Sequence, residues 1–187
     1  MAEGAGEWVR YCWRCGAALP ATPPITCEAC GQAHYLNPAP CGEAVVVRAG
    51  KVLLLRRAND PYRGSWDVPG GFCDGGEHPM RAAERELHEE LGLAGRATAY
   101  IGAWLDVYGE PAPDGLHTHC ITSAYLVTLA DPGAEPRPNP EEAAGYGWFD
   151  LTALPEDLAF PDHARPMLRA AAELIAGTAE PLPDRTW

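Results

Sequence analysis

Three glutamates are spaced so that an α-helix would present them on one face. Glu86, Glu89 and Glu90 lie three and four residues apart, and successive residues of a helix are about 100° apart around its axis. Carboxylates this close repel one another, and a divalent cation among them would offset that cost. Because hard oxygen ligands suit Mg²⁺ or Mn²⁺, the spacing predicts a magnesium or manganese site. A solvated acidic helix face is the alternative that the spacing leaves open.

Four of the seven cysteines form two matched Cys-x-x-Cys pairs, which are Cys12 with Cys15 and Cys27 with Cys30. A glycine follows the second cysteine of each pair and permits a tight turn that brings both thiolates to one ion. Four sulfurs make a closed tetrahedral site, which is typical of structural zinc. Redox-active pairs, bound iron and free thiols are the alternatives. The other cysteines lack such spacing and are interpreted as packing residues.

Two arginines are candidates for contacts with substrate. Arg56 and Arg57 end an apolar segment, and the planar fork of a guanidinium suits phosphate oxygens. Two arginines at the end of a strand are equally consistent with plain surface charges.

The elements that must position these residues follow from the apolar pattern. Residues 43–48 and 51–57 are predicted strands joined by a tight turn, and hence a hairpin. Residues 66–72 are predicted as a short strand that runs into a glycine loop. The glutamates belong to a helix over 79–91, with a proline near its start and Gly92 just after its end. Further elements follow in chain order: strands within 96–107, 118–129 and 146–150, and a closing helix over 162–176.

The closing helix has an apolar face at helical spacing, formed by Met167, Leu168, Ala171, Leu174 and Ile175. Tyr100, Trp104 and Tyr108 recur every four residues before it, and either a stacking surface for a ring or core packing would account for them. The tail that follows residue 177 is expected to be irregular. Strands and helices mixed in this order predict a sheet with helices packed on it.

Charge and hydropathy exclude several classes of function. The chain has 187 residues and a formal net charge of −12, which repels phosphate backbones and makes long nucleic acids unlikely partners. No run approaches the roughly 18 apolar residues of a membrane helix. The N-terminus also lacks the basic start and apolar stretch of a signal peptide. We therefore expect a cytoplasmic protein with no membrane partner.

The residues around the glutamates resemble the signature of the Nudix hydrolase superfamily. That signature is a glycine, five residues, a glutamate, seven residues, and then Arg-Glu-apolar-any-Glu-Glu-any-Gly-apolar. All nine specified positions match, and they are Gly71, Glu77, Arg85, Glu86, Leu87, Glu89, Glu90, Gly92 and Leu93. The resemblance covers about residues 42–177. It implies an α+β fold, a Nudix-type α/β/α sandwich with a mixed sheet between helices, preceded by a small zinc ribbon. We expect the ribbon in residues 1–41 and the hydrolase domain in residues 42–187.

The resemblance also implies roles for individual residues. The three glutamates bind the catalytic cation, and the carbonyl oxygen of Gly70 completes its coordination. Arg85 orients the glutamates, and Glu77 holds Arg85 in turn. The general base varies within the superfamily, and Glu141 and Glu142 are candidates because they lie in a region that often supplies it.

The activity that the resemblance implies is Mg²⁺-dependent hydrolysis of the diphosphate linkage of a nucleoside diphosphate derivative. A four-cysteine ribbon before this signature is similar to the branch that acts on NADH, ADP-ribose or flavin dinucleotide. Residues 103–111 depart from the proline-rich motif of the NADH enzymes, so the sequence predicts a dinucleotide-like substrate without choosing one. A nucleoside triphosphate pyrophosphohydrolase and a non-catalytic nucleotide sensor are the alternatives. The expected partner is a small nucleotide, and the chain could also form a homodimer.

Overall fold

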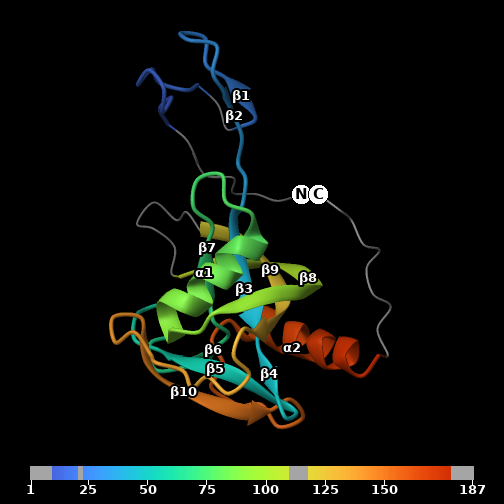
Figure 1. The fold of residues 1–187 in the computed structure, drawn as a ribbon. Coiled ribbons are helices and arrows are strands. Elements are labelled where there is room, and N and C mark those ends of the chain that lie inside the picture. Colours follow the sequence, from blue (N-terminus) through green and yellow to red (C-terminus); the bar gives the residue numbers. More distant parts are fainter. Residues whose placement is uncertain (1–9, 21–22, 110–117, 178–187) are drawn as a thin grey trace.

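The computed structural model describes residues 10–20, 23–109 and 118–177, so the expected irregular tail lies outside the described residues. The N-terminal part forms a small lobe that stands apart at the end of one long strand (Figure 1). We call this lobe, residues 10–20 and 23–34, the ribbon. It contains the antiparallel strands β1 (Ile25–Thr26) and β2 (Ala33–His34).

The remainder contains two four-stranded sheets. In the first, the strand order is β7-β3-β9-β8, and the strands are β3 (Ala39–Val45), β7 (Gly70–Phe72), β8 (Gly95–Tyr108) and β9 (Thr118–Leu129). Strands β3 and β9 pair in parallel and the other pairs are antiparallel, so this sheet is mixed. The second sheet is antiparallel and consists of β4 (Val47–Arg48), β5 (Lys51–Arg57), β6 (Trp66–Asp67) and β10 (Ala143–Asp150).

Two segments that the sequence predicted as single strands are each divided between the two sheets. The predicted hairpin is confirmed only at its tip, where β4 pairs with β5, because the chain changes sheets at Val46. Val45 and Val46 are both buried but belong to different core clusters, which explains the apolar run without alternation. The predicted glycine loop was also wrong, because Gly70 and Gly71 lie in β7 and pair with β3.

Two helices cover the sheets on opposite sides. Helix α1 (Pro79–Leu91) buries Ala83, Leu87 and Leu91 in one core cluster, and α2 (Pro161–Ile175) buries Met167 and its neighbours in the other. Both helices agree with the predicted ranges to within one residue. Ile175 is an exception on the predicted apolar face, since it is 49% exposed in the last turn. No helix among the described residues is long and apolar enough to cross a membrane.

Strand β3 connects the ribbon to the sheets. It begins at Ala39 and is paired with β9 from its first residue. The division predicted between residues 41 and 42 falls inside this strand, and we propose a boundary before Ala39, where the strand begins.

Candidate active site

Local interactions hold helix α1 at both ends, and the sequence predicted one of them, at Gly92. The His78 Nδ1 atom accepts a hydrogen bond from the backbone N–H of Met80 (3.2 Å), which satisfies one free donor at the N-terminus. At the other end Gly92 adopts a left-handed conformation with φ of 65°, which favours glycine. The helix therefore ends at the glycine of the signature, with Glu89 and Glu90 in its last turn and Glu86 one turn earlier.

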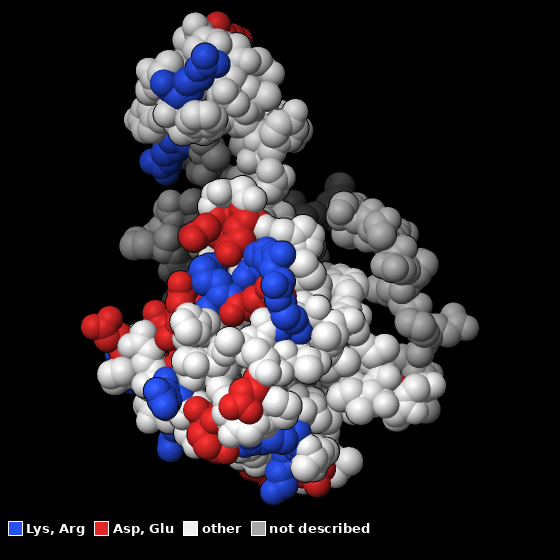
Figure 2. All heavy atoms as spheres, in the orientation of Figure 1, with Lys and Arg blue, Asp and Glu red and all other residues white. Residues whose placement is uncertain are grey.

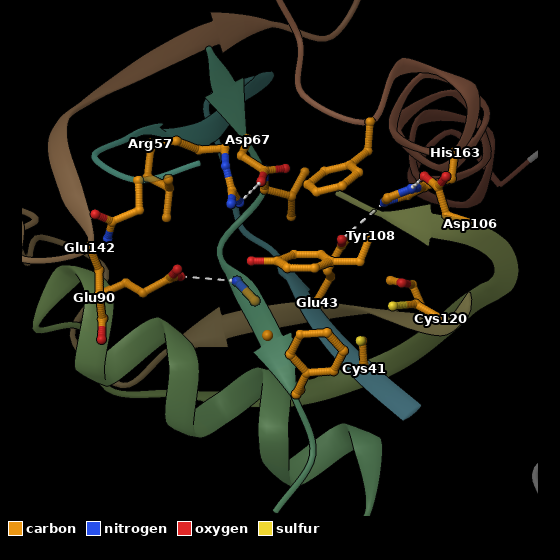
Figure 3. Close-up of a pocket in the computed structure, with 18 of the residues that line it drawn as sticks. Cys41, Glu43, Arg57, Asp67, Glu90, Asp106, Tyr108, Cys120, Glu142 and His163 are labelled. Carbon is orange, nitrogen blue, oxygen red and sulfur yellow. Dashed lines mark hydrogen bonds and ion pairs between the residues drawn. The ribbon is translucent and has the colours of Figure 1, made fainter. Parts of the chain in front are cut away.

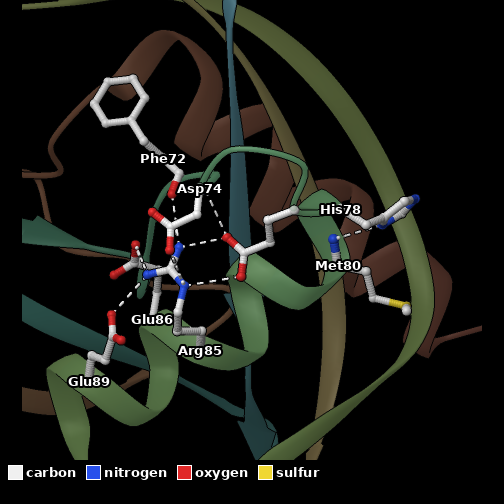
Figure 4. A network of polar contacts seen from close by, with 8 residues as sticks. Phe72, Asp74, His78, Met80, Arg85, Glu86 and Glu89 are labelled. Atoms are coloured by element: carbon white, nitrogen blue, oxygen red, sulfur yellow. Dashed lines mark hydrogen bonds and ion pairs between the residues drawn. The ribbon is translucent and has the colours of Figure 1, made fainter.

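Arg85 is the centre of an ion-pair network on α1 (Figure 4). One edge of its guanidinium donates to both oxygens of Glu77, at 3.1 and 2.8 Å. Its Nη1 atom donates to Glu86 and Glu89, each at 2.8 Å. Acidic and basic side chains accordingly gather over α1 in the space-filling view (Figure 2). Arg85 also donates to the carbonyl of Phe72 at 2.9 Å, so one side chain joins the helix to β7. The contacts are compatible with the roles expected for Glu77 and Arg85, which stay predictions.

Glu90 and Glu86 also lie against two glycines of β7, Gly70 and Gly71. Glu90 accepts a hydrogen bond from the backbone N–H of Gly70 at 3.0 Å. A Cβ atom on Gly71 would overlap with the carboxylate of Glu86, so a larger residue there would require the Glu86 side chain to shift. Burial raises the pKa of Glu86, and burial together with the charge of Glu86 raises the pKa of Glu90 well above its usual range.

A cavity of about 190 Å³ is lined by Glu90, whereas Glu86 and Glu89 are not part of its lining. Figure 3 shows side chains converging on it from both sheets and from both helices. Its polar lining comes mainly from Glu43, Arg57, Asp67, Glu90, Asp106, Thr122, Glu142 and His163. Carboxylates dominate this lining, so the cavity as a whole is negatively charged at neutral pH.

The two predicted arginines have different surroundings. Arg57 lines the cavity and donates to the buried carboxylate of Asp67 at 2.7 Å. Burial and the charge of Glu43 raise the pKa of Asp67 to about 6, although Arg57 acts in the opposite direction. Arg56 is exposed, donates to the Gly64 carbonyl at 2.8 Å and is not part of the cavity lining.

A three-residue network that sequence reasoning missed lies at the other end of the cavity. The ring of His163, from α2, contacts Asp106 through Nδ1 at 2.5 Å and Glu43 through Nε2 at 3.0 Å. Burial lowers the pKa of His163, but the contacts with Glu43 and Asp106 outweigh it and raise the pKa to about 9. At neutral pH the ring is therefore a cation, with both of its N–H groups donating. We call Glu43, Asp106 and His163 the histidine triad.

Each member of the histidine triad has a weak signal in the sequence. Glu43 interrupts an apolar segment, and His163 lies four residues before Met167 on an otherwise apolar helix face. A buried histidine or a strand-end carboxylate is common without any function, however. Only the fold brings residues 43, 106 and 163 together.

With the site geometry established, comparison with known proteins identifies the family. The family described as "NUDIX domain" matches residues 42–171, which is more than half of the chain. The chain belongs to the Nudix family. The predicted family and the predicted Nudix-type fold are thus confirmed, with the correction that two sheets lie between the helices.

Individual relatives support the same assignment. The chain is 34% identical over 131 residues to the ADP-ribose pyrophosphatase of Methanocaldococcus jannaschii, covering 70% of this chain and 72% of that one. It is 30% identical over 183 residues to the NAD-capped RNA hydrolase NudC of Stutzerimonas stutzeri, covering 95% of this chain and 62% of that one. This chain therefore spans less than two thirds of the NudC relative. A crystal structure of a NUDIX hydrolase from Nitrosomonas europaea has a TM-score of 0.70 at 25% identity and covers 93% of this chain and 97% of that one.

The Nudix glutamates fit a divalent cation by their chemistry. Proteins of this family generally use divalent metals, and the donors on α1 are carboxylate oxygens of the kind that Mg²⁺ binds. The carbonyl oxygen of Gly70 belongs to the same residue whose N–H meets Glu90. In the described residues, however, the four ribbon cysteines form the one group of His, Cys, Asp or Glu whose ligand atoms all lie within 4.8 Å of one another. The glutamates are instead held by Arg85 and Gly70.

The ribbon of this Nudix chain brings all four predicted cysteines together. The Sγ atoms of Cys12 and Cys30 are 3.6 Å apart, and those of Cys15 and Cys27 are 3.7 Å apart. A tetrahedral zinc site with bonds of about 2.3 Å has sulfur–sulfur edges of about 3.8 Å, so the spacing fits zinc. The two turns are equivalent, since the glycine after each pair has a φ near 75° and donates to the carbonyl of the first cysteine at 2.8 Å.

Some of the candidates for a general base and for ring stacking line the cavity, and the others do not. Glu141 and Glu142 are both exposed, but only Glu142 lines the cavity. Tyr108 also lines the cavity, whereas Tyr100 packs on Tyr125 and Trp104 packs against the α2 core cluster. Their common spacing in the sequence thus does not give them a common environment.

Proposed function

We propose that this chain is a Mg²⁺-dependent hydrolase that cleaves the diphosphate linkage of a nucleoside diphosphate derivative, with a dinucleotide-like substrate such as ADP-ribose, FAD or NAD(H). The observation that supports the proposal best is the meeting of Glu90, the backbone of Gly70 and the cation of Arg57 at one cavity. In this proposal the Glu90 carboxylate serves as a ligand for the cation, and the Arg57 guanidinium serves as a fork for phosphate in the same cavity lining. The names of the relatives, an ADP-ribose pyrophosphatase and an NAD-capped RNA hydrolase, agree with a diphosphate substrate.

In this proposal each residue has a defined task. Glu86, Glu89, Glu90 and the Gly70 carbonyl would hold the divalent cation, while Arg85 and Glu77 keep the carboxylates in place. When bound, the cation supplies positive charge that acidifies a water molecule and stabilises the leaving phosphate oxygens. Arg57 orients the diphosphate. Arg56 would contact substrate only outside the cavity. Glu142 is the better placed of the two general-base candidates, and its carboxylate would take a proton from the attacking water.

The ribbon has a separate role in the proposal. We infer that Cys12, Cys15, Cys27 and Cys30 bind one structural zinc ion, because four thiolates around one ion leave no open position for chemistry. We also retain the homodimer as a proposal, which sedimentation of the purified protein would test.

A substrate panel with matched variants tests the hydrolase proposal. Products of ADP-ribose, FAD, NADH and common nucleoside triphosphates are quantified with and without Mg²⁺, using wild type, Glu90→Gln and the exposed control Glu156→Gln. We expect Mg²⁺-dependent cleavage of a diphosphate, a rate loss on the order of 100-fold in Glu90→Gln and wild-type rates in Glu156→Gln. A triphosphate preferred by tenfold or more would favour the pyrophosphohydrolase alternative. Binding without turnover would favour the sensor.

A further inference from the structure

One buried oxygen of the histidine triad has no partner. Glu43 is 8% exposed and lines the cavity. Its Oε1 atom contacts His163, but its Oε2 atom is buried and meets no hydrogen-bond donor in the described part of the chain. Leaving a buried acceptor unpaired costs about 1–3 kcal/mol, and more when it is charged. Such an atom in a cavity wall indicates a place where a bound molecule donates a hydrogen bond.

The histidine triad fixes the direction of this free oxygen. His163 uses both ring nitrogens, one on Glu43 and one on Asp106, so the ring cannot turn without breaking a contact between two ions. The triad joins β3, β8 and α2, so its members are held by three separate elements. The free oxygen is therefore oriented before any ligand arrives, which lowers the entropy lost on binding.

The chemistry of the complementary group is limited by what a carboxylate can do. An ionised carboxylate only accepts hydrogen bonds, so its partner is a hydroxyl, an N–H group or a cation. No group of His, Cys, Asp or Glu around Glu43 gathers its ligand atoms within 4.8 Å, as far as the structure describes the chain. The several carboxylates of the lining also disfavour an additional phosphate. A neutral group rich in hydroxyls fits these conditions.

The aromatic side of the cavity argues against a nucleobase at this end. Tyr108 stacks on Phe160 with ring centroids 5.8 Å apart, and Phe72 meets the edge of Tyr108 at 5.1 Å. A base between two rings needs about 7 Å, which is twice a carbon–carbon contact of about 3.5 Å. The rings are too close to admit a base between them, and they form an apolar part of the lining of the same cavity as Glu43.

We propose that the histidine-triad end of the cavity binds the sugar attached to the second phosphate of the substrate, with Glu43 accepting hydrogen bonds from its hydroxyl groups and His163 acting as the positioning residue. This inference rests on the proposed diphosphate hydrolase function and narrows it to substrates that carry a sugar without a third phosphate at that position.

Two diphosphates that differ only beyond the second phosphate provide the test. We compare ADP-ribose with the methyl ester of ADP on its β-phosphate, in which a methyl group replaces the sugar. Wild type is expected to have a kcat/KM at least about tenfold higher for ADP-ribose. Glu43→Gln is expected to lose at least about tenfold on ADP-ribose, mainly through KM, and less than about twofold on the methyl ester. Glu156→Gln serves as the control and is expected to change neither.

Further measurements separate a sugar contact from other roles of Glu43. Mn²⁺ affinity, followed by electron paramagnetic resonance, is expected to be unchanged in Glu43→Gln. His163→Gln is expected to raise KM for ADP-ribose selectively, because Glu43 loses its orientation. Glu43→Asp provides a second variant if the glutamine variant does not fold, and it should show the same selective loss because its oxygen is withdrawn from the cavity.

The possible failures are distinguishable. Equal losses on both diphosphates, weaker Mn²⁺ binding in Glu43→Gln, or no preference for ADP-ribose in wild type would each overturn the sugar subsite while leaving the hydrolase intact. If wild type with Mg²⁺ cleaves neither of these diphosphates nor FAD nor NADH, the proposed function itself is overturned.

Discussion

Gly71 positions a carboxylate by lacking a side chain. It lies in β7 directly opposite α1, at the point where a Cβ atom would overlap with Glu86. The neighbouring Arg85 donates a hydrogen bond to the Glu86 carboxylate at 2.8 Å. The position of Glu86 is therefore set by a strand backbone on one side and by a guanidinium on the other.

This arrangement predicts a large effect from one added methyl group. In Gly71→Ala the Glu86 carboxylate must move, and a displacement of about 1 Å in a catalytic group can cost about 100-fold in rate. We expect kcat to fall by tenfold or more, with the melting temperature changed much less. Gly75→Ala is the control, because a Cβ atom there meets nothing within 4 Å. Equal kcat values for the two variants would show that Glu86 tolerates displacement.

Residues within one motif could be predicted, and residues joined only by the fold could not. The spacing of Glu86, Glu89 and Glu90 on a helix is local, since the turn of the helix alone brings them together. The histidine triad depends on contacts across 57 and 120 residues of sequence separation. No local periodicity encodes such a contact, so a single sequence does not indicate it.

At the scale of elements, α1 was predictable because residue types mark both of its ends, with Pro79 at the start and Gly92 after the end. The strands were harder. Val45 and Val46 belong to different core clusters, so an apolar run crosses from one sheet to the other without any polar residue to mark the change. The lengths of β5 and β9 were predictable. The two points at which the chain passes from one sheet to the other, near Val46 and near Val68, were not.

Helix α2 is linked to β3 and β8 through the charged ring of His163, and this link makes stability depend on pH. The folded pKa of His163 is raised from 6.5 to about 9, so its stabilisation is complete below pH 6.5, declines above that pH and is lost as the pH rises through 9. The difference corresponds to about 3 kcal/mol. The ionisable groups facing it are Glu43 and Asp106, with Asp67 further away.

We expect the unfolding free energy of wild type to fall between pH 7 and pH 10 by about 2.5 kcal/mol more than that of His163→Gln. Denaturant titrations of both proteins at a series of pH values measure this difference. Groups other than His163 titrate in both proteins and cancel in the comparison. Parallel pH profiles for the two proteins would contradict the charged state of His163.

At the scale of the whole molecule, the ribbon is too small to fold around its own apolar core. Its strands β1 and β2 have two residues each, and its two aromatic residues, Tyr11 at 64% and Trp13 at 74%, are largely exposed. Segments of this size usually derive their folding free energy from a metal or from disulfides. The four clustered sulfurs favour the metal.

We expect purified protein to contain about one zinc ion per chain by elemental analysis. Replacing Cys12 and Cys15 together by serine should abolish zinc binding and unfold the ribbon, with a smaller effect on hydrolysis. Cys73→Ser is the matched control, because Cys73 lies outside the cluster. A folded ribbon without bound metal in wild type would contradict the prediction.

Strand β3 has a consequence for anyone who recombines parts of this protein. Alternate residues of the strand face opposite ways: Gly42 lies so close to Pro79 of α1 that a Cβ atom would overlap with its carbonyl, while Glu43 faces the cavity. One residue inserted between Ala39 and Gly42 would exchange these faces and drive the Glu43 side chain against the helix. An insertion before Ala39 leaves the parity of the strand intact. Ribbon swaps and linker libraries therefore belong before Ala39. There the chain length can vary without changing which residues of β3 face the cavity and which face α1.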